Sequence, residues 1–208
     1  MKLPHLFVSN ARQMTGLALA AILLTGCSSA TMTNPSRSAT EQLLLSTAAD
    51  RAINSISLDM FAQKRVFVDG AYYESYDSKY VIGAIRDALS RSGALLVNAG
   101  SNSDVIVEAR SGGLSIDASD TLVGIAQSGL PIPLAGVLNI PELSIYKSNR
   151  QHSIAKLALL AYSTHTLEHV FSSGPMLGKS YNKYYKLLGI IQWTTTDIPE
   201  KKHKKSHH

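Results

Sequence analysis

Two segments of the amino-terminal half carry apolar residues at helical spacing. In 39–60 they stand three or four positions apart, which predicts an amphipathic helix with Leu45, Ala49, Ala52, Ile56 and Met60 on one face. Ser38 and Glu41 have the spacing of a capping box at its start. The segment 79–92 predicts a second helix with Val81, Ala84, Ile85, Ala88 and Leu89 on one face. Gly93 is well placed to end it.

Short apolar runs flank the second predicted helix. Residues 65–69 predict one strand and 94–97 another, and a turn follows at 98–103. A strand, a helix and a strand at this spacing form a βαβ unit, whose strands are expected to be parallel neighbours.

The carboxy-terminal half has the pattern of strands. Residues 153–162 are apolar on both faces, which fits a central strand or a buried helix, and the hairpin context favours a strand. Gly112 and Gly113 interrupt an alternating segment and predict a bulge. The other expected strands are 104–117, 142–147, 168–172 and 187–195, with turns at 148–151 and 165–167. The predicted fold is α/β (α+β): two amino-terminal helices packed on a mixed sheet, with a carboxy-terminal half rich in β-hairpins.

An uncharged segment, 121–141, interrupts this series. Its apolar residues include Leu122, Val123, Ile125, Leu130, Ile132 and Leu134. Repeated glycines and prolines exclude a membrane-spanning helix. We favour a connecting segment packed over the domain's own core. The alternative is an exposed apolar segment that contacts a bilayer or a partner subunit.

The first 27 residues have the pattern of an export signal. Lys2 and Arg12 accompany an uncharged run at 14–24, the length of a signal-peptide core and short of the roughly 20 residues that cross a bilayer. Leu24, Thr25, Gly26 and Cys27 follow, and this sequence resembles the lipobox of bacterial lipoproteins. The resemblance implies that a signal peptidase recognises Leu24, Thr25 and Gly26, and that Cys27 becomes the acylated first residue.

The domain organisation follows from this reading. Residues 1–26 form the signal peptide, 27–37 the acylated cysteine with a polar tether, 38–199 a single domain, and 200–208 a basic disordered tail. Cys27 is the only cysteine, so the chain can form no internal disulfide. Ser28 after the cysteine resembles the signal for outer-membrane sorting, which implies a lipid anchor in that membrane and a domain in the periplasm.

Charge excludes one class of partner. The chain has 20 basic and 15 acidic residues, but 27–199 contains 14 of each, so the excess lies at the two ends. A neutral body with a basic tail is not a nucleic-acid-binding surface.

The order of elements carries a family resemblance. The lipobox, the strand at 66–69, Leu122-Val123-Gly124-Ile125, Leu130-Pro131-Ile132-Pro133 and Pro141-Glu142-Leu143 look like an uncharacterised family of bacterial lipoproteins, a domain of unknown function. More distantly, the start of the domain is similar in architecture to envelope lipoproteins of the curli-secretion and penicillin-binding-protein-activator type. The second likeness implies envelope assembly and raises the case for membrane contact by 121–140.

Motifs for catalysis or metal binding are weak. Gly178-Lys179-Ser180 lacks the preceding glycine of a phosphate-binding loop, because position 173 is serine. His165 and His169 are spaced for zinc only if they lie on a helix, and the pattern there predicts a turn. Asp117 and Asp120 lack the oxygen-rich loop of a calcium site. We therefore expect no metal and no cofactor.

Two groups of residues are candidates for a functional site, one for binding and one for catalysis. Tyr72, Tyr73 and Tyr76 follow a strand end, where α/β folds place binding groups, and could contact a ligand or partner. Glu108, Asp117 and Glu142 are the carboxylates of a cell-wall or lipid hydrolase if they meet in space.

The sequence thus favours a non-enzymatic, lipid-anchored binding or assembly module with an envelope protein or the cell wall as partner. The alternative is an oligomeric structural or secretion-pore subunit that uses 121–140, and a hydrolase comes third.

Overall fold

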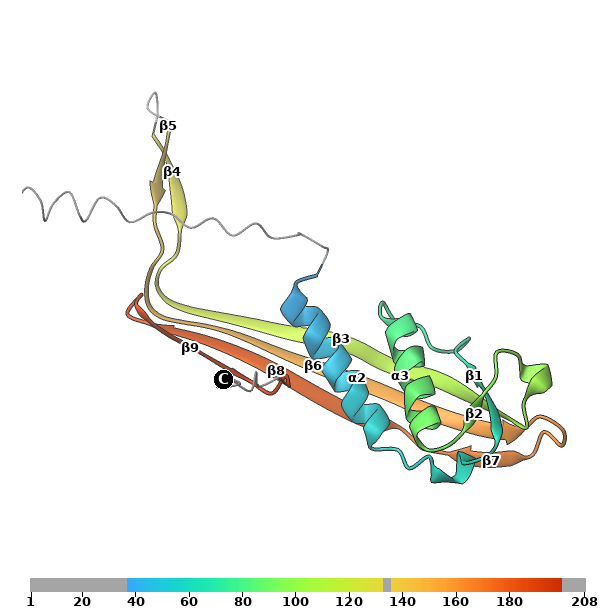
Figure 1. Ribbon diagram of the computed structural model, residues 1–208. Helices are drawn as coiled ribbons and strands as arrows, with labels where there is room; N and C mark the ends of the chain where they lie inside the picture. Colours follow the sequence, from blue (N-terminus) through green and yellow to red (C-terminus); the bar gives the residue numbers. More distant parts are fainter. Residues whose placement is uncertain (1–36, 133–135, 200–208) are drawn as a thin grey trace, which may run out of the picture. The chain divides into compact units, whose positions relative to one another are not determined.

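The computed structural model describes residues 37–199 except 133–135. The predicted signal peptide, Cys27, the tether up to residue 36 and the basic tail lie outside the described residues. Within them, about half of the residues are strand and 23% are helix. Figure 1 shows helices α2 (Ala39–Asn54) and α3 (Ser78–Arg91) lying on one face of a long sheet. Two short 3₁₀ turns, η1 (Asp59–Phe61) and η2 (Gly100–Asn102), connect elements.

The main sheet of the described chain has seven strands in the order β2-β1-β3-β6-β8-β9, with β7 beside β6. Their bounds are β1 Arg65–Asp69, β2 Leu95–Leu96, β3 Val105–Ile125, β6 Leu143–Ser163, β7 His169–Ser172, β8 Met176–Leu187 and β9 Ile191–Thr196. β1 pairs in parallel with β2 and β3, and the other pairs are antiparallel. A separate hairpin of β4 (Ser128–Ile132) and β5 (Gly136–Ile140) connects β3 to β6.

The apolar core lies between the two helices and one end of the sheet. Alternate residues of β6 from Ala155 to Ala161 point to the helices and are almost fully buried, as are Val105, Val107 and Ala109 of β3. Small residues let α2 lie very close to β8: a Cβ added at Gly178 would stand 1.9 Å from the carbonyl oxygen of Ala48. We call this layered end the proximal sheet.

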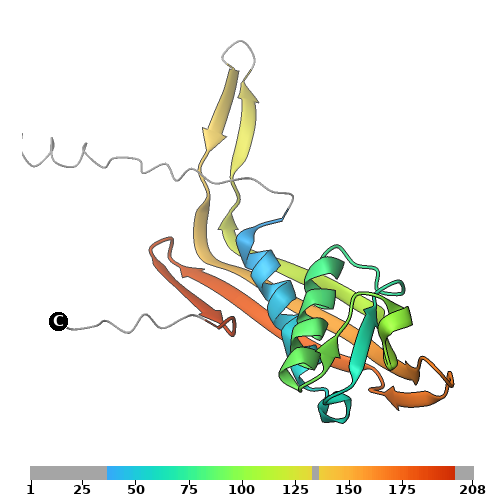
Figure 2. The same cartoon turned by 45° about the vertical axis from the view of Figure 1, so that its right-hand side comes forward.

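The sheet continues well past the helices. In Figures 1 and 2, β3, β6, β8 and β9 extend beyond α2 as a ribbon, and neither of the described helices lies over it. Among the described side chains, no apolar residue between positions 110 and 154 is buried. We define the distal sheet as Thr121–Ile125, Leu143–Ser148, Tyr184–Leu187 and β9.

Several local predictions are confirmed. Ser38 and Glu41 form the capping box at the start of α2. β1 and β2 are parallel neighbours, and the register of β3 shifts between Ser111 and Gly113 as the two glycines predicted. The turn before β7 is also present, and 153–162 is strand.

The predicted fold class is wrong. The α/β fold with two amino-terminal helices packed on a mixed sheet gives way to a chain that is mostly strand, with two long β-strands and helices over only part of one face. The expected turn at 148–151 lies inside β6, and Thr121–Ile125 lies inside β3. Polar residues resembled turn formers there because no described helix covers this part of the sheet, so most of its polar positions stay at least partly exposed.

Candidate interaction surface

Exposed apolar side chains gather at the distal end of the sheet. The described chain exposes 21 large hydrophobic residues, and twelve of them lie in the distal sheet, in the turn between β8 and β9 or in the β4–β5 hairpin. They are Leu122, Val123, Ile125, Val137, Leu138, Leu143, Ile145, Leu187, Leu188, Ile190, Ile191 and Trp193. A concentration of this kind is typical of a surface that contacts a partner or a membrane, whereas scattered exposed residues are ordinary.

The strand register assigns these residues to faces. Residues directly opposite each other on paired strands share a face, and successive residues alternate. Gly178 and Ala155 are paired and face α2, which defines the helix face. Counting along β6 and β8 from there, Tyr146, Leu187 and Ile191 fall on the opposite face, in one row with Val123. The distal sheet therefore turns an apolar row away from the helix face.

A row of aromatic residues borders the apolar row on the same face. Tyr185 stacks on Trp193 with ring centroids 5.3 Å apart and planes 19° from parallel. The guanidinium of Arg150 lies 5.9 Å from the centre of the Tyr185 ring, a cation–π arrangement. The neighbouring side chains of Ser148 and Arg150 lower the pKa of Tyr146. Aromatic rings beside apolar residues suit a surface that is partly desolvated on contact.

The helix face of the distal sheet has a different character. Lys147 Nζ donates to Glu142 Oε2 at 2.7 Å, and Asn149 Nδ2 donates to Asp120 Oδ1 at 2.6 Å. The Tyr184 hydroxyl donates to Gln192 Oε1 at 2.7 Å. These polar groups satisfy one another, so this face can stay in water while the apolar face makes contact.

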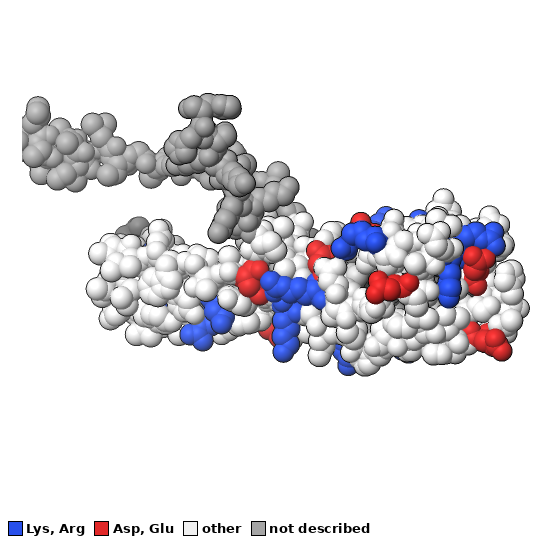
Figure 3. All heavy atoms as spheres, turned by 60° about the horizontal axis from the view of Figure 1, so that its bottom comes forward, with Lys and Arg blue, Asp and Glu red and all other residues white. Residues whose placement is uncertain are grey.

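Charged groups are unevenly distributed between the two ends of the sheet. On the face that Figure 3 shows, the left-hand end, which holds the distal ends of the long strands, has few blue or red groups, and most of the visible charges lie toward the centre and the right-hand end. An end with few charges loses little hydration energy when a partner covers it.

The uncharged segment that the sequence singled out belongs partly to this surface. Leu122, Val123 and Ile125 are at the end of β3 and exposed, so they do not pack over the domain's own core as we had favoured. Leu130 and Ile132 are on β4, where the structure describes the backbone only, and Leu134 lies outside the described residues. A glycine is required at 124, because a Cβ there would stand 2.1 Å from the Leu143 carbonyl oxygen.

The three tyrosines of the predicted binding loop between β1 and α3 differ in burial. Tyr73 is buried and packs in the core, and burial raises its pKa. Tyr72 and Tyr76 are exposed, and the Arg37 guanidinium lies 4.1 Å from the centre of the Tyr76 ring. Arg37 also forms an ion pair with Asp77 at 2.6 Å. Two of the three tyrosines can therefore meet a partner, and the third is structural.

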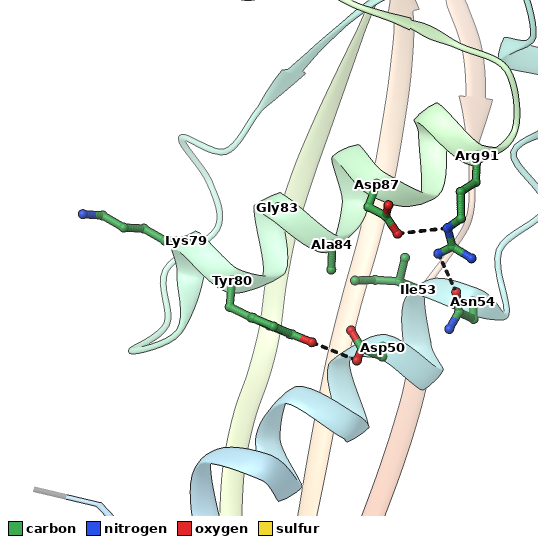
Figure 4. A pocket seen from close by; sticks show the side chains of 9 residues that line it. All are labelled: Asp50, Ile53, Asn54, Lys79, Tyr80, Gly83, Ala84, Asp87 and Arg91. Carbon is green, nitrogen blue, oxygen red and sulfur yellow. Dashed lines mark hydrogen bonds and ion pairs between the residues drawn. The ribbon is translucent and has the colours of Figure 1, made fainter. Parts of the chain in front are cut away.

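A shallow groove of about 480 Å³ lies between α2 and α3 (Figure 4). The Tyr80 hydroxyl donates to Asp50 at 2.9 Å, and burial together with this hydrogen bond raises the pKa of Tyr80 to about 12. Arg91 bridges Asp87 and Asn54. Because its polar groups bind one another across the groove, they act as ties between the helices more readily than as ligands for a small molecule.

The candidate catalytic and metal residues do not converge. Glu108 and Asp117 are nine residues apart on β3, which is roughly 30 Å along a strand, and Glu142 comes after the far end of β3. Glycosidase carboxylates lie within about 10 Å of each other. Within the described chain, no three His, Cys, Asp or Glu residues are grouped to hold a metal ion. Gly178-Lys179-Ser180 lies in β8, where the glycine serves helix contact.

Sequence reasoning missed the larger part of this surface. Leu143, Ile145, Leu187, Ile191 and Trp193 were assigned to strands without a site. The signal that could have found them is the alternation of apolar and polar residues in 143–147 and the nearly continuous apolar run at 187–193, because no predicted helix offered a matching apolar face to cover them.

One further feature bears on membranes: no helix in the described part of the chain is both long and apolar enough to cross one.

Comparisons with known proteins add a family without a function. No curated protein matches the chain. A family model does match, and it covers residues 21–200, from before Cys27 to the end of the sheet. The chain therefore belongs to the family of unknown function DUF6655.

Proposed function

We propose that this protein is a lipoprotein of a bacterial cell envelope, anchored through an acylated Cys27, that works without catalysis as a binding and assembly module. The mature chain faces the periplasm from the outer membrane. Its partner is another envelope protein or the cell wall, and the distal sheet is the surface that meets it.

The anchor rests on the sequence. Leu24, Thr25, Gly26 and Cys27 follow an uncharged run of signal-peptide length, and Cys27 has no second cysteine with which to pair. Three acyl chains hold a protein on a bilayer firmly, since each buried CH₂ contributes about 0.8 kcal/mol. A tether of ten residues then keeps the domain within about 36 Å of its membrane.

The observation that carries the binding role is the bare apolar face of the distal sheet. This face has Val123, Leu187 and Ile191 in one row, and no described element covers it. Leaving apolar area in water costs roughly 25 cal/mol for each Å². Contact with a partner removes that cost. Nothing comparable favours a catalytic role, because the candidate carboxylates lie far apart.

The experiment combines labelling and crosslinking in the intact cell. The full-length chain should incorporate radioactive palmitate, and Cys27→Ser should abolish the label. A photo-reactive amino acid at Leu143 should form crosslinks, whereas the same amino acid at Leu177 should not. Leu143 and Leu177 are matched controls, since they are 59% and 58% exposed but lie in the distal and proximal sheet. Unlabelled wild-type protein contradicts the anchor, and equal crosslinking at both positions contradicts the binding surface.

A second candidate is an oligomeric structural or secretion-pore subunit. The two-sided character of the distal sheet favours it, because an apolar face backed by a polar face suits an assembly that contacts lipid or other subunits on one side only. In this alternative, residues 121–140 take part through Val123, Ile125 and the β4–β5 hairpin. The expected architectural likeness to curli-secretion lipoproteins belongs to this proposal.

A further inference from the structure

β3 has a long open edge. On one side it pairs with β6 along its length, but on the other β1 pairs only with Val105–Glu108. Beyond that point the described chain offers this edge one backbone hydrogen bond outside the ladders, from the Ser111 N–H to the Tyr72 carbonyl. Residues 114–123 therefore present unpaired backbone donors and acceptors in a regular strand.

β9 provides a second open edge at the other side of the same sheet. It pairs with β8 from Ile191 to Thr196, and no described strand lies beyond it. Its sequence, Ile-Gln-Trp-Thr-Thr-Thr, is uncharged, contains no proline and consists mostly of residues that favour strands.

Both edges carry few of the features that keep edge strands apart: Asp117 and Asp120 are the only charged residues in the open run of β3, and the six residues of β9 carry no charge. Natural edge strands are short, or contain lysine, proline or a bulge in the exposed stretch. Residues 114–123 contain no lysine and no proline, and the two register shifts of β3 lie at the ends of this run, at Ser111/Gly113 and Val123/Gly124. A β3 edge of ten residues without lysine, proline or an internal bulge is a template on which another strand can pair.

We propose that the sheet also pairs edge to edge with further copies of this chain, the β3 edge of one copy lying antiparallel to the β9 edge of the next, while its apolar face stays open to the envelope partner. This contact is head to tail, so each copy uses both edges and the assembly grows into a ring or a filament. The inference rests on the proposed function in treating the distal sheet as a contact surface, and it requires no acylation.

Strand direction and register support this pairing. β3, β6, β8 and β9 alternate in direction, so a neighbouring β3 beside β9 continues the antiparallel order. Val123, Tyr146, Leu187 and Ile191 form one row, which places Val123 of the next copy beside Ile191. The apolar face then continues without interruption from copy to copy.

The charges favour unlike edges over like edges. The open part of β3 carries Asp117 and Asp120 and no basic residue, while β8, the strand beside β9, carries Lys179, Lys183 and Lys186. Pairing β3 with β3 would gather the four aspartates of two copies on one short edge, which is unfavourable. It would also turn one copy end for end and separate the two apolar rows.

The test uses cysteines introduced into the full-length chain with Cys27→Ser, purified in mild detergent, so that the introduced cysteines are the only thiols. Val123→Cys and Ile191→Cys replace side chains that are 51% and 53% exposed, so neither change disturbs the core. Oxidation of the double variant should give a ladder of covalent multimers, and a mixture of the two single variants should give a dimer. The two positions in one copy are three strand spacings apart, roughly 14 Å, so they cannot bond within a copy.

A second pair and an edge variant extend the test. Thr121→Cys with Ile191→Cys reads a register shifted by two residues and also supports the pairing if it crosslinks. By light scattering, wild-type protein should be a multimer. Ala118→Lys should shift it toward monomer because lysine protects an edge, and Ala118→Val should not.

Four outcomes overturn the proposal. They are a crosslinked dimer of Val123→Cys alone, a crosslinked dimer of Ile191→Cys alone, a wild-type monomer, and a multimer that crosslinks in neither register. Palmitate labelling is read separately, so the anchor can fail while the pairing stands, and the reverse.

Discussion

The two ends of β6 differ in what covers them and not in how they are built. Leu159 and Leu143 lie on the same strand, paired to β3 in the same antiparallel ladder. Leu159 faces α2 and the core and is fully buried, whereas no described element covers Leu143, which is 59% exposed. Alternation of apolar residues thus specifies a strand in both places, and only the second layer decides whether that strand becomes core or contact surface.

The comparison also separates two sources of stability. The proximal sheet gains from apolar burial against the helices and from the close approach of α2 to Gly178. The distal sheet has strand pairing and a few polar pairs, such as Lys147 with Glu142. We expect the distal sheet to open at lower denaturant concentrations than the proximal sheet, as local unfolding does where few apolar contacts oppose it.

The largest expected effect comes from Gly178→Val. A Cβ at this position would stand 1.9 Å from the Ala48 carbonyl oxygen and 2.7 Å from the Ala52 nitrogen, so α2 must move off β8. We expect a loss of about 3 kcal/mol or more in the free energy of unfolding, measured in urea by circular dichroism.

The matched control is Gly83→Ala in α3. Nothing lies within 4 Å of a Cβ there, so the same kind of change should stabilise the protein by about 0.5–1 kcal/mol through helix propensity. Equal losses from both variants would show that the proximal layers are not packed as closely as described.

The second prediction sets Leu159→Ala against Leu143→Ala. The first should cost about 2–5 kcal/mol because it leaves a cavity in the core. The second should change the free energy of unfolding by less than about 0.5 kcal/mol, as exposed substitutions do. Trp193, the only tryptophan, reports the distal sheet by fluorescence, and helix ellipticity reports the proximal end. A large loss from Leu143→Ala in the isolated monomer would mean that the distal face is covered within the chain.

Local signals made part of this fold predictable from sequence. The capping box at Ser38 and Glu41, the parallel pair of β1 and β2, and the register shift at Gly113 all depend on neighbouring residues. The length of β6 depends on partners far along the chain. Ser148-Asn149-Arg150-Gln151 reads as a turn by composition, but each of these residues is held in the ladder between β3 and β8.

The candidate surface was predicted in outline only. The uncharged run from residue 121 indicated an apolar feature, and Val123 and Ile125 do lie on the exposed face of the distal sheet. Trp193 and Ile191 could not be assigned to the same face from sequence, because that needs the register of three strand pairs. A register shifted by one residue would have moved them to the opposite face.

The third prediction concerns the ion pair of Arg51 and Asp197, which joins α2 to the residue after β9. Arg51 donates to Asp197 at 2.5 Å and to the Lys179 carbonyl at 2.6 Å, and Asp197 also accepts hydrogen bonds from the Ser180 hydroxyl and the Tyr181 N–H. Arg51→Ala should cost about 1–3 kcal/mol, because it leaves a partly buried carboxylate with fewer partners.

Arg91→Ala is the control variant for Arg51→Ala. Arg91 and Asp87 form an exposed pair four residues apart on α3, worth about 0.3–0.5 kcal/mol. Urea midpoints of the two variants should therefore differ clearly. Arg51→Ala should also move the unfolding transition of Trp193 fluorescence to a lower urea concentration, because Asp197 directly follows β9. A change in helix ellipticity without a change in Trp193 fluorescence would show that Arg51 does not stabilise the end of β9.

The smallest expected effect is a pH dependence confined to the proximal sheet. The Asp104 carboxylate accepts hydrogen bonds from the Arg65 guanidinium and from the Arg65 backbone N–H, and these lower the pKa of Asp104 to about 2. A carboxylate whose pKa is lower in the folded state stabilises the fold above its unfolded pKa of about 3.9, and that contribution is lost as the pH falls toward 2. Asp104→Asn should flatten the decline in urea midpoint between about pH 4 and pH 2 when helix ellipticity is followed, because Arg65 and Asp104 join the starts of β1 and β3. The Trp193 signal should show the same acid dependence in Asp104→Asn and wild-type protein if the two ends unfold separately. A matching shift in both signals would instead mean that the whole sheet unfolds as one cooperative unit.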